Sequence, residues 1–223
     1  MSPSYDAVVQ KEIVEYIDTL VAHLGDLELK FRIWLALTEE LRQRPETLNL
    51  APGFFVPVRS ALVTDVILSL SRLFEDRSDR NIPHLLRRIE QDLSRLESKK
   101  EILRSPTPDV PPLEVGIEID LETIQQHRLR ICEAEKLVTV LLTHRDKFYA
   151  HHDKEYFGEP SKLQDEAPLG SKDIESLILT AEEILTTYLA AFKGVDLRIS
   201  PTSPTQTTKV LRILQKVVAG GMT

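Results

Sequence analysis

Ten consecutive residues, from His144 to Asp153, concentrate the side chains of this chain that could do chemistry. The segment holds three of the six histidines together with one arginine, one lysine and two aspartates. A neutral histidine accepts and returns a proton close to neutral pH. An arginine guanidinium presents a planar fork of N–H donors that fits an anion with two oxygens. The residue types in this segment therefore favour proton transfer and anion binding.

Metal binding and the common catalytic motifs fit this sequence poorly. His151 and His152 are adjacent, so they point in different directions on a helix. His144 and Asp146 do not provide a pair of ligands four residues apart. The chain also has no glycine-rich phosphate loop, no Gly-x-Ser-x-Gly motif and no His-Glu-x-x-His motif. We therefore predict no metal and no cofactor.

The apolar pattern predicts one long helix over residues 121–152, with Arg145 near its end. At 100° per residue, Arg145 lies about 20° from Val138, which marks the centre of the buried stripe. A charged side chain on a core-facing stripe needs an ionic partner or an opening into a cleft. Basic residues at the C-terminal end of a helix also interact favourably with the helix dipole, so a structural role explains the cluster as well. The residues alone leave both interpretations open.

The elements that must position this segment are helices from end to end of the chain. Apolar residues recur at spacings of three and four, the period of a helix face. The pattern predicts helices over residues 8–41, with an interruption at Gly25, and over residues 54–74, 83–104, 121–152 and 171–194. Residues 105–116 contain four prolines and are predicted as a loop and not as a strand. We expect an all-α, up-and-down bundle of about five main helices.

Single residues mark where these helices begin and break. Gly25 interrupts the first apolar pattern, and Asn81 with Pro83 gives the start of the third helix. Ser171 is expected to cap the last helix of the bundle. Cys132 lies among apolar residues of the predicted long helix, so we expect a small core residue there and not a nucleophile.

Length and composition indicate a soluble protein with one domain and a short tail. The chain has 223 residues, 42% hydrophobic and 28% charged, with a formal net charge of −7. We place the domain at residues 1–194. Residues 195–223 form a Ser/Thr/Pro-rich linker and a short amphipathic tail helix, expected at 210–218.

One cysteine excludes an internal disulfide, and the N-terminus lacks the pattern of a secretory signal, so we expect a cytoplasmic location without membrane contact. The acidic balance argues against broad binding of nucleic acid but not against a local basic site.

In this helical context the cluster resembles the HEPN (higher eukaryote and prokaryote nucleotide-binding) superfamily. The similar pattern is an arginine, a polar residue, four further residues and a histidine near the end of a long helix, here Arg145, Asp146 and His151. The form Arg-Asp-Lys-x-x-Ala-His-x-Asp looks most like the abortive-infection toxin branch. The stretch Asp-x-x-Leu-Ser-Leu-Ser-Arg-Leu, within residues 65–76, is also similar to that branch.

The resemblance implies a metal-independent endoribonuclease, of the kind often found as the toxin of a toxin–antitoxin or phage-defence system. It implies that His151 is the acid–base residue, that Arg145 clamps the phosphate and that Asp146 orients one or both. The remaining polar side chains of the segment, Lys147, Tyr149, His152 and Asp153, would support RNA binding. Implied partners are RNA, an antitoxin protein and a second copy in a homodimer.

Two features of this sequence depart from the family pattern. Some members carry a tyrosine two residues after the histidine, where a partner enzyme modifies it, but this chain has Asp153. On an ideal helix, His151 is also rotated by about 120° from Arg145, whereas His152 is rotated by only about 20°. His151 follows the pattern, with His152 as the alternative acid–base residue. A non-catalytic helical interaction module and a nucleotide-binding module remain alternative functions.

Overall fold

The computed structural model describes residues 5–76, 80–98, 101–103, 113–150, 165–194 and 205–220. The main helices are α1 (Tyr5–Gln43), α2 (Pro45–Leu48), α3 (Pro52–Phe74), α4 (Ile82–Asp92), α5 (Leu121–Glu133), α6 (Glu135–His144), α9 (Ser171–Lys193) and α10 (Thr205–Gly220). A 3-10 turn, η1 (Leu93–Arg95), follows α4, and a π-helical segment, η2 (Arg145–Ala150), follows α6. Two short strands, β1 (Glu101–Leu103) and β2 (Leu113–Val115), form a hairpin. The all-α prediction is confirmed, with this hairpin as an addition.

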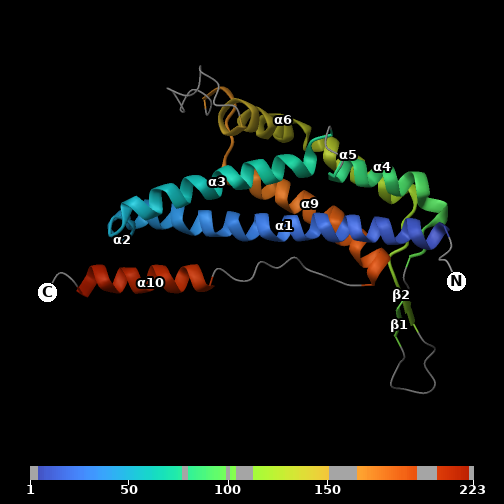
Figure 1. Cartoon of the computed structure of the whole chain (residues 1–223), viewed down its shortest axis with the longest axis horizontal. Helices are drawn as coiled ribbons and strands as arrows, with labels where there is room; N and C mark the ends of the chain where they lie inside the picture. Colours follow the sequence, from blue (N-terminus) through green and yellow to red (C-terminus); the bar gives the residue numbers. More distant parts are fainter. Residues whose placement is uncertain are drawn as a thin grey trace.

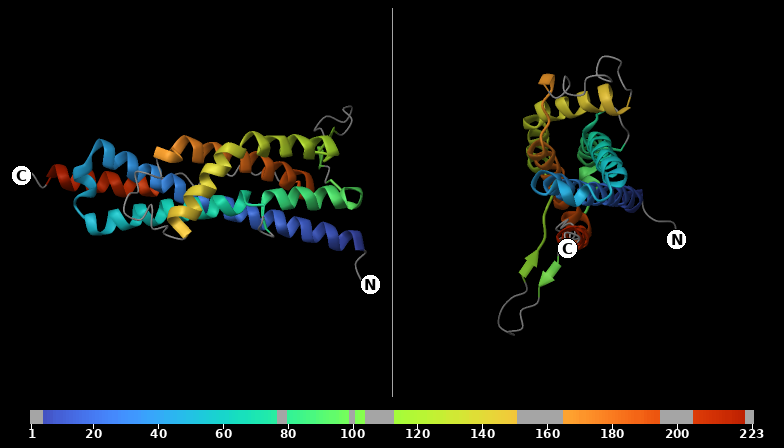
Figure 2. Two further views of the ribbon diagram at one scale, coloured as in Figure 1. Left: turned by 90° about the horizontal axis from the view of Figure 1, so that it is seen from above. Right: turned by 90° about the vertical axis from the view of Figure 1, so that its left-hand side faces the viewer.

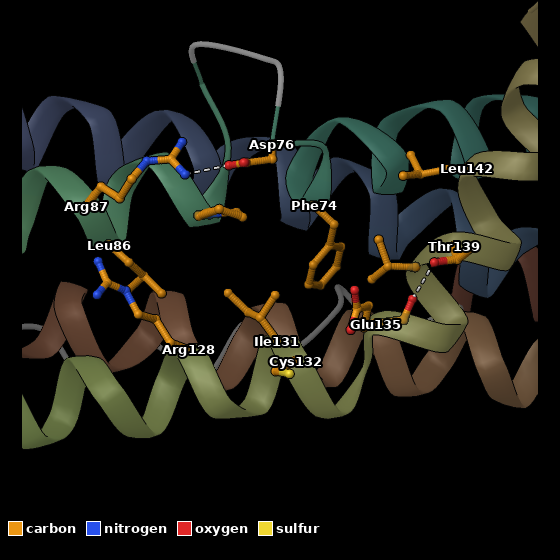
Figure 3. A pocket seen from close by; sticks show the side chains of 12 residues that line it. Phe74, Asp76, Leu86, Arg87, Arg128, Ile131, Cys132, Glu135, Thr139 and Leu142 are labelled. Carbon is orange, nitrogen blue, oxygen red and sulfur yellow. Dashed lines mark hydrogen bonds and ion pairs between the residues drawn. The ribbon is translucent and has the colours of Figure 1, made fainter.

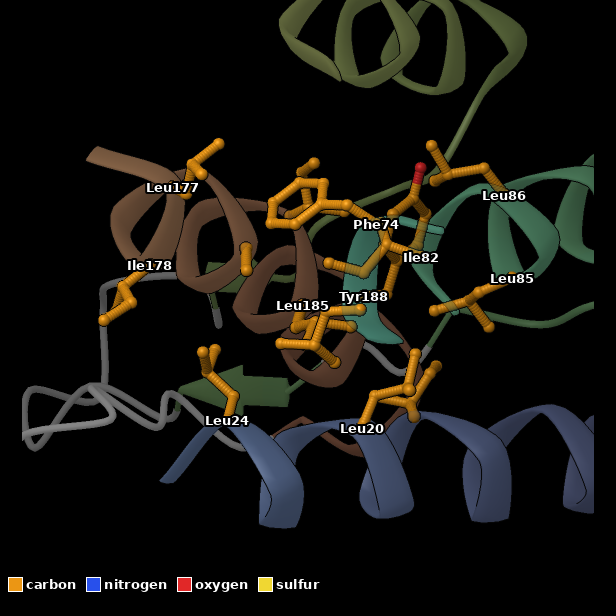
Figure 4. Close-up of a cluster of buried hydrophobic side chains, with 14 of the residues drawn as sticks. Leu20, Leu24, Phe74, Ile82, Leu85, Leu86, Leu177, Ile178, Leu185 and Tyr188 are labelled. Carbon is orange, nitrogen blue, oxygen red and sulfur yellow. The ribbon is translucent and has the colours of Figure 1, made fainter. Parts of the chain in front are cut away.

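The bundle is built along α1, which packs lengthwise against α3 and α9 (Figure 1). Leu20 and Leu24 of α1 point toward Leu185 of α9 in a core whose side chains are fully buried (Figure 4). The buried stripe of α1 continues without a break across Gly25, because Leu24 and Leu27 on either side are both buried. A glycine inside a helix costs about 1 kcal/mol relative to alanine, and burial of the flanking leucines exceeds that cost. The predicted interruption at Gly25 is therefore wrong.

Side-chain hydrogen bonds cap the N-terminal ends of α4 and α9. Asn81 is the N-cap of α4, as predicted, and its Oδ1 accepts a hydrogen bond from the backbone N–H of His84 at 2.6 Å. The N-cap of α9 is Gly170 and not Ser171. The carboxylate of Asp173 accepts a hydrogen bond from the Gly170 N–H at 2.8 Å, which supplies the cap from the third helical residue.

The hairpin corrects two expectations. The predicted helix over residues 83–104 ends in the η1 turn, and residues 101–103 form β1. β2 lies in the predicted loop and pairs antiparallel with β1, with Ile102 opposite Glu114. Residues 113–115 contain no proline, because all four prolines of the loop precede them, so their N–H groups are free to join a ladder.

The predicted long helix over residues 121–152 is three segments in the structure. α5 ends at Glu133, Ala134 forms a turn, and α6 runs only to His144. The reason for the break is tertiary: both segments contact α9, but α5 also packs against α4, whereas α6 crosses α3 (Figure 2). One straight helix could not make both sets of contacts.

The tail helix α10 is longer than predicted and packs on the bundle. Leu211 is 6% exposed and joins a small second cluster with Leu37, Leu48 and Phe55. The amide of Gln215 donates to both carboxylate oxygens of Glu40, at 2.8 and 3.0 Å. The tail is therefore held by contacts separate from those of the main core.

Among the described residues, one helix, α3, has the length and apolar composition of a membrane span. Core helices of soluble proteins pass the same test, and α3 places Val66, Leu70 and Leu73 in the bundle core. This feature is weak evidence for a membrane.

Candidate functional site

The predicted site lies where α6 changes into the π-helical segment η2. The π-helix closes hydrogen bonds five residues apart, and such segments often occur at functional positions. Beyond His144 the ideal-helix angles used to compare His151 with His152 therefore do not apply. His151, His152 and Asp153 themselves lie outside the described residues.

Arg145 is held between two carboxylates at the first position of η2. Its Nη1 lies 2.5 Å from Oε2 of Glu75, and its Nε donates to Oδ1 of Asp146 at 2.7 Å. Glu75 is the C-cap residue of α3, whose own N–H donates to the carbonyl of Ser71. The Arg145 side chain is 17% exposed, so it occupies the edge of the bundle as the core-facing stripe predicted. The two ion pairs offset the cost of removing the guanidinium from water.

The electrostatics of Arg145 follow from these contacts. The hydrogen bond that Arg145 donates to Asp146 has the largest effect and, with the contact to Glu75, raises the pKa of the Arg145 guanidinium, while burial lowers it. Among the described residues, Nη2 has no hydrogen-bonding partner. Within the part of the chain that the structure describes, the contacts orient the guanidinium through Nη1 and Nε.

His144 has a structural position beside the site. It is 7% exposed, and its Nε2 lies 2.6 Å from the carbonyl oxygen of Ala167. This distance fits an N–H donor on Nε2, which ties the end of α6 to the segment that precedes α9. Of the other supporting residues, Lys147 is half-buried on η2, and the structure places the backbone of Tyr149 in the same segment.

Sequence reasoning did not identify Glu75 as part of this site. Two signals were available to find it. An arginine on a buried stripe requires a carboxylate, and Glu75 directly follows the predicted helix over residues 54–74. It also lies within the second stretch that resembles the abortive-infection branch, residues 65–76.

The expectation that Cys132 is a small core residue is wrong. The side chain is exposed on α5, beside a cavity between the α3–α4 turn and the α5–α6 bend. Cys132 lies next to the C-terminal end of α5, just before the chain bends at Ala134. Within the part of the chain that the structure describes, no group of three His, Cys, Asp or Glu side chains could hold a metal ion.

Comparison with known proteins places the chain in a family. The family model AbiU2, a HEPN family, matches residues 10–198, which is most of the chain. A search of curated proteins and a search of solved structures each give no match. The match includes both the α3 end with Glu75 and the η2 segment with Arg145. The chain thus belongs to the AbiU2 family, an abortive-infection branch of the HEPN superfamily.

Proposed function

We propose that this protein is a metal-independent endoribonuclease that serves as the toxin of a toxin–antitoxin or phage-defence system. The proposal depends on the contacts of the Arg145 side chain. Two carboxylates orient its guanidinium at the bundle edge, and Nη2 remains without a partner among the described residues. An oriented guanidinium with spare donors suits the charge that develops on a phosphate in the transition state.

The proposed reaction is cleavage through the ribose 2′-hydroxyl. His151 accepts the 2′-OH proton as the 2′-oxygen attacks the adjacent phosphorus, and the 5′-oxygen of the next nucleotide leaves and takes up a proton. Arg145 binds the non-bridging oxygens, and Asp146, which contacts Nε of Arg145, orients it. His152 is the alternative acid–base residue, and Lys147, Tyr149 and Asp153 support RNA binding. The products end in a 2′,3′-cyclic phosphate.

A second candidate is a non-catalytic interaction module, or a module that binds nucleotides without cleavage. The observation that favours it is the same double pairing, because a structural arginine at a bundle edge would also have two carboxylate partners. The two candidates differ in what the pairing is for: it positions a phosphate clamp in the first and holds η2 on α3 in the second.

RNA cleavage in EDTA by wild type and Arg145→Ala separates these candidates. The nuclease proposal predicts activity without divalent metal and a loss of about 100-fold to 1,000-fold in the variant. Arg130→Ala is the matched control, since Arg130 of α5 also pairs with two carboxylates, those of Glu133 and Glu183, and lies away from η2. The interaction module predicts no cleavage and a loss of about 1–3 kcal/mol in the unfolding free energy of Arg145→Ala. Cleavage that EDTA abolishes and Mg²⁺ restores would contradict the metal-independent mechanism.

We further propose a two-fold homodimer in which the arginine of one copy faces the histidine of the other across one cleft. Two-fold pairing is the commonest homo-oligomer, and two basic clusters in one groove would attract RNA to a chain of net charge −7. Mixing Arg145→Ala and His151→Ala chains tests it, because a shared site restores one intact half-site in the mixed dimer. A monomer of 25.4 kDa by light scattering would contradict it. An antitoxin protein as partner and a cytoplasmic location belong to the same proposal.

A further inference from the structure

A cavity of about 570 Å³ lies between the α3–α4 turn and the α5–α6 bend (Figure 3). This volume is within the range of about 300–1,000 Å³ that holds small molecules in proteins. Four elements contribute to its walls: the end of α3, the start of α4, α5 and α6. The most apolar part of the lining consists of Phe74, Leu86, Ile131, Val138 and Leu142.

The stripe that predicted a buried face on one long helix explains this lining. Ile131, Val138 and Leu142 lie on that stripe, but the bend at Ala134 turns α5 and α6 toward different neighbours. All three side chains are only partly buried as a result. Among the described elements, no single helix covers the stripe, and it forms an apolar wall that a ligand could contact.

The charged groups at the cavity are balanced except for one carboxylate. Arg87 pairs with Asp76 at 2.6 Å. Arg128 makes two hydrogen bonds to the carboxylate of Glu90, at 3.1 and 2.5 Å. Glu135, in the first turn of α6, has no ionic partner among the described residues. The side chains of Phe74, Ile131 and Glu135 point toward the same space in Figure 3.

We propose that this cavity binds a small molecule with an apolar body and one cationic group. The apolar body contacts Phe74, Ile131 and Val138, and the cation pairs with the carboxylate of Glu135. Anionic ligands are disfavoured, because both arginines of the lining are already paired with carboxylates and Glu135 repels a negative charge. A cation next to an apolar wall gains from both burial and charge pairing.

This site is separate from the proposed nuclease site. Arg145 does not line the cavity, although Leu142 lies less than one helical turn before it and Phe74 and Asp76 flank its partner Glu75. Binding of a ligand here therefore does not depend on whether the chain cleaves RNA. Arg145→Ala should leave binding in the cavity unchanged.

Cys132 gives a direct readout, since it is exposed, lines the cavity and is the one cysteine of the chain. We would measure the rate of thiol labelling in the presence of three probes with the same ring: phenethylamine, 2-phenylethanol and 3-phenylpropionate. Phenethylamine should protect the thiol and bind about fivefold more tightly by calorimetry than the alcohol, with the carboxylate weakest.

Glu135→Gln is the matched variant, because it keeps the size of an exposed side chain and removes the charge. It should bind phenethylamine and 2-phenylethanol equally, while Arg145→Ala keeps the wild-type preference. A large side chain at the rim, in Cys132→Trp, should prevent binding of all three probes by calorimetry. Equal binding of the three probes to wild type, or no binding of any, would overturn the proposal.

Discussion

Two polar side chains between residues 121 and 150, one on α5 and one on η2, differ in burial and in the charge of their partners. On α5, His127 is 7% exposed and its Nδ1 lies 3.0 Å from the hydroxyl of Tyr188, a residue of α9 that is fully buried. On η2, Arg145 is 17% exposed and contacts two carboxylates. The first is a buried pair that joins two helices. The second is a charged cluster at the surface edge.

This difference in burial and charge distinguishes a contact that stabilises the fold from a group that is a candidate for catalysis. Burial raises the pKa of the Tyr188 hydroxyl and lowers the pKa of His127, so both groups stay neutral inside the bundle. The two aromatic rings also meet edge to face at 5.2 Å, so the pair fills space as well as bonding. The Arg145 cluster keeps its charge, and within the described ranges its Nη2 has no hydrogen-bonding partner. Changes at the first pair should therefore affect stability, and changes at the second should affect reaction with RNA.

The largest expected effect is on stability, in Tyr188→Ala. Loss of the buried ring leaves a cavity and removes the partner of His127, so the unfolding free energy should fall by about 3–5 kcal/mol. Chemical denaturation measures it. Leu179→Ala is the control, because Leu179 is on the same helix but 53% exposed, and a change within about 0.5 kcal/mol is expected there. Similar losses of unfolding free energy in both variants would show that the His127–Tyr188 pair stabilises the fold no more than an exposed side chain of the same helix.

Arg145→Lys tests the charged cluster on η2. Lysine keeps the charge but has one nitrogen, so it cannot contact both Glu75 and Asp146 and still hold a phosphate in a fork. We expect about a tenfold loss of cleavage, smaller than that of Arg145→Ala, with the unfolding free energy within about 1 kcal/mol of wild type. Cleavage equal to wild type would mean that charge alone, and not the oriented fork, matters at this position.

The smallest effect is a pH dependence of stability that the neutral pair creates. Because the pKa of His127 is lowered from 6.5 in the folded protein, the unfolded chain binds a proton first as the pH falls below 6.5. Stability from this group is present above that pH and is lost toward the lower folded pKa, by up to about 1.4 kcal/mol per pH unit. Glu183 and Arg130 act on His127 in opposite directions, the carboxylate raising its pKa and the guanidinium lowering it.

Denaturation of wild type and His127→Gln between pH 5 and pH 8 isolates this contribution from the other titrating groups. The variant should lose less stability than wild type as the pH falls. Parallel curves for the two proteins would contradict the neutral state of His127 in the fold.

The spacing of apolar residues predicted a helix well where its apolar face packs on the bundle core along its whole length. The stripe of α9 runs through Leu177, Ala181 and Leu185, and these residues are buried as expected. The start of α4 was also predictable, because an Asn N-cap acts within a few residues of the chain. Prediction failed at Gly25 and at Ala134, where distant helices decide whether a pattern continues or bends.

The sequence by itself determined the all-α class, the family to which the chain belongs and the position of Arg145 on a core-facing stripe. Those features depend on residue types and spacings within one segment. Only the tertiary structure decided that Glu75 pairs with Arg145, that Cys132 is exposed and that His127 bonds Tyr188 across 61 residues of chain. Each of these depends on how helices from distant parts of the chain pack together, and periodicity within one helix carries no information about its neighbour.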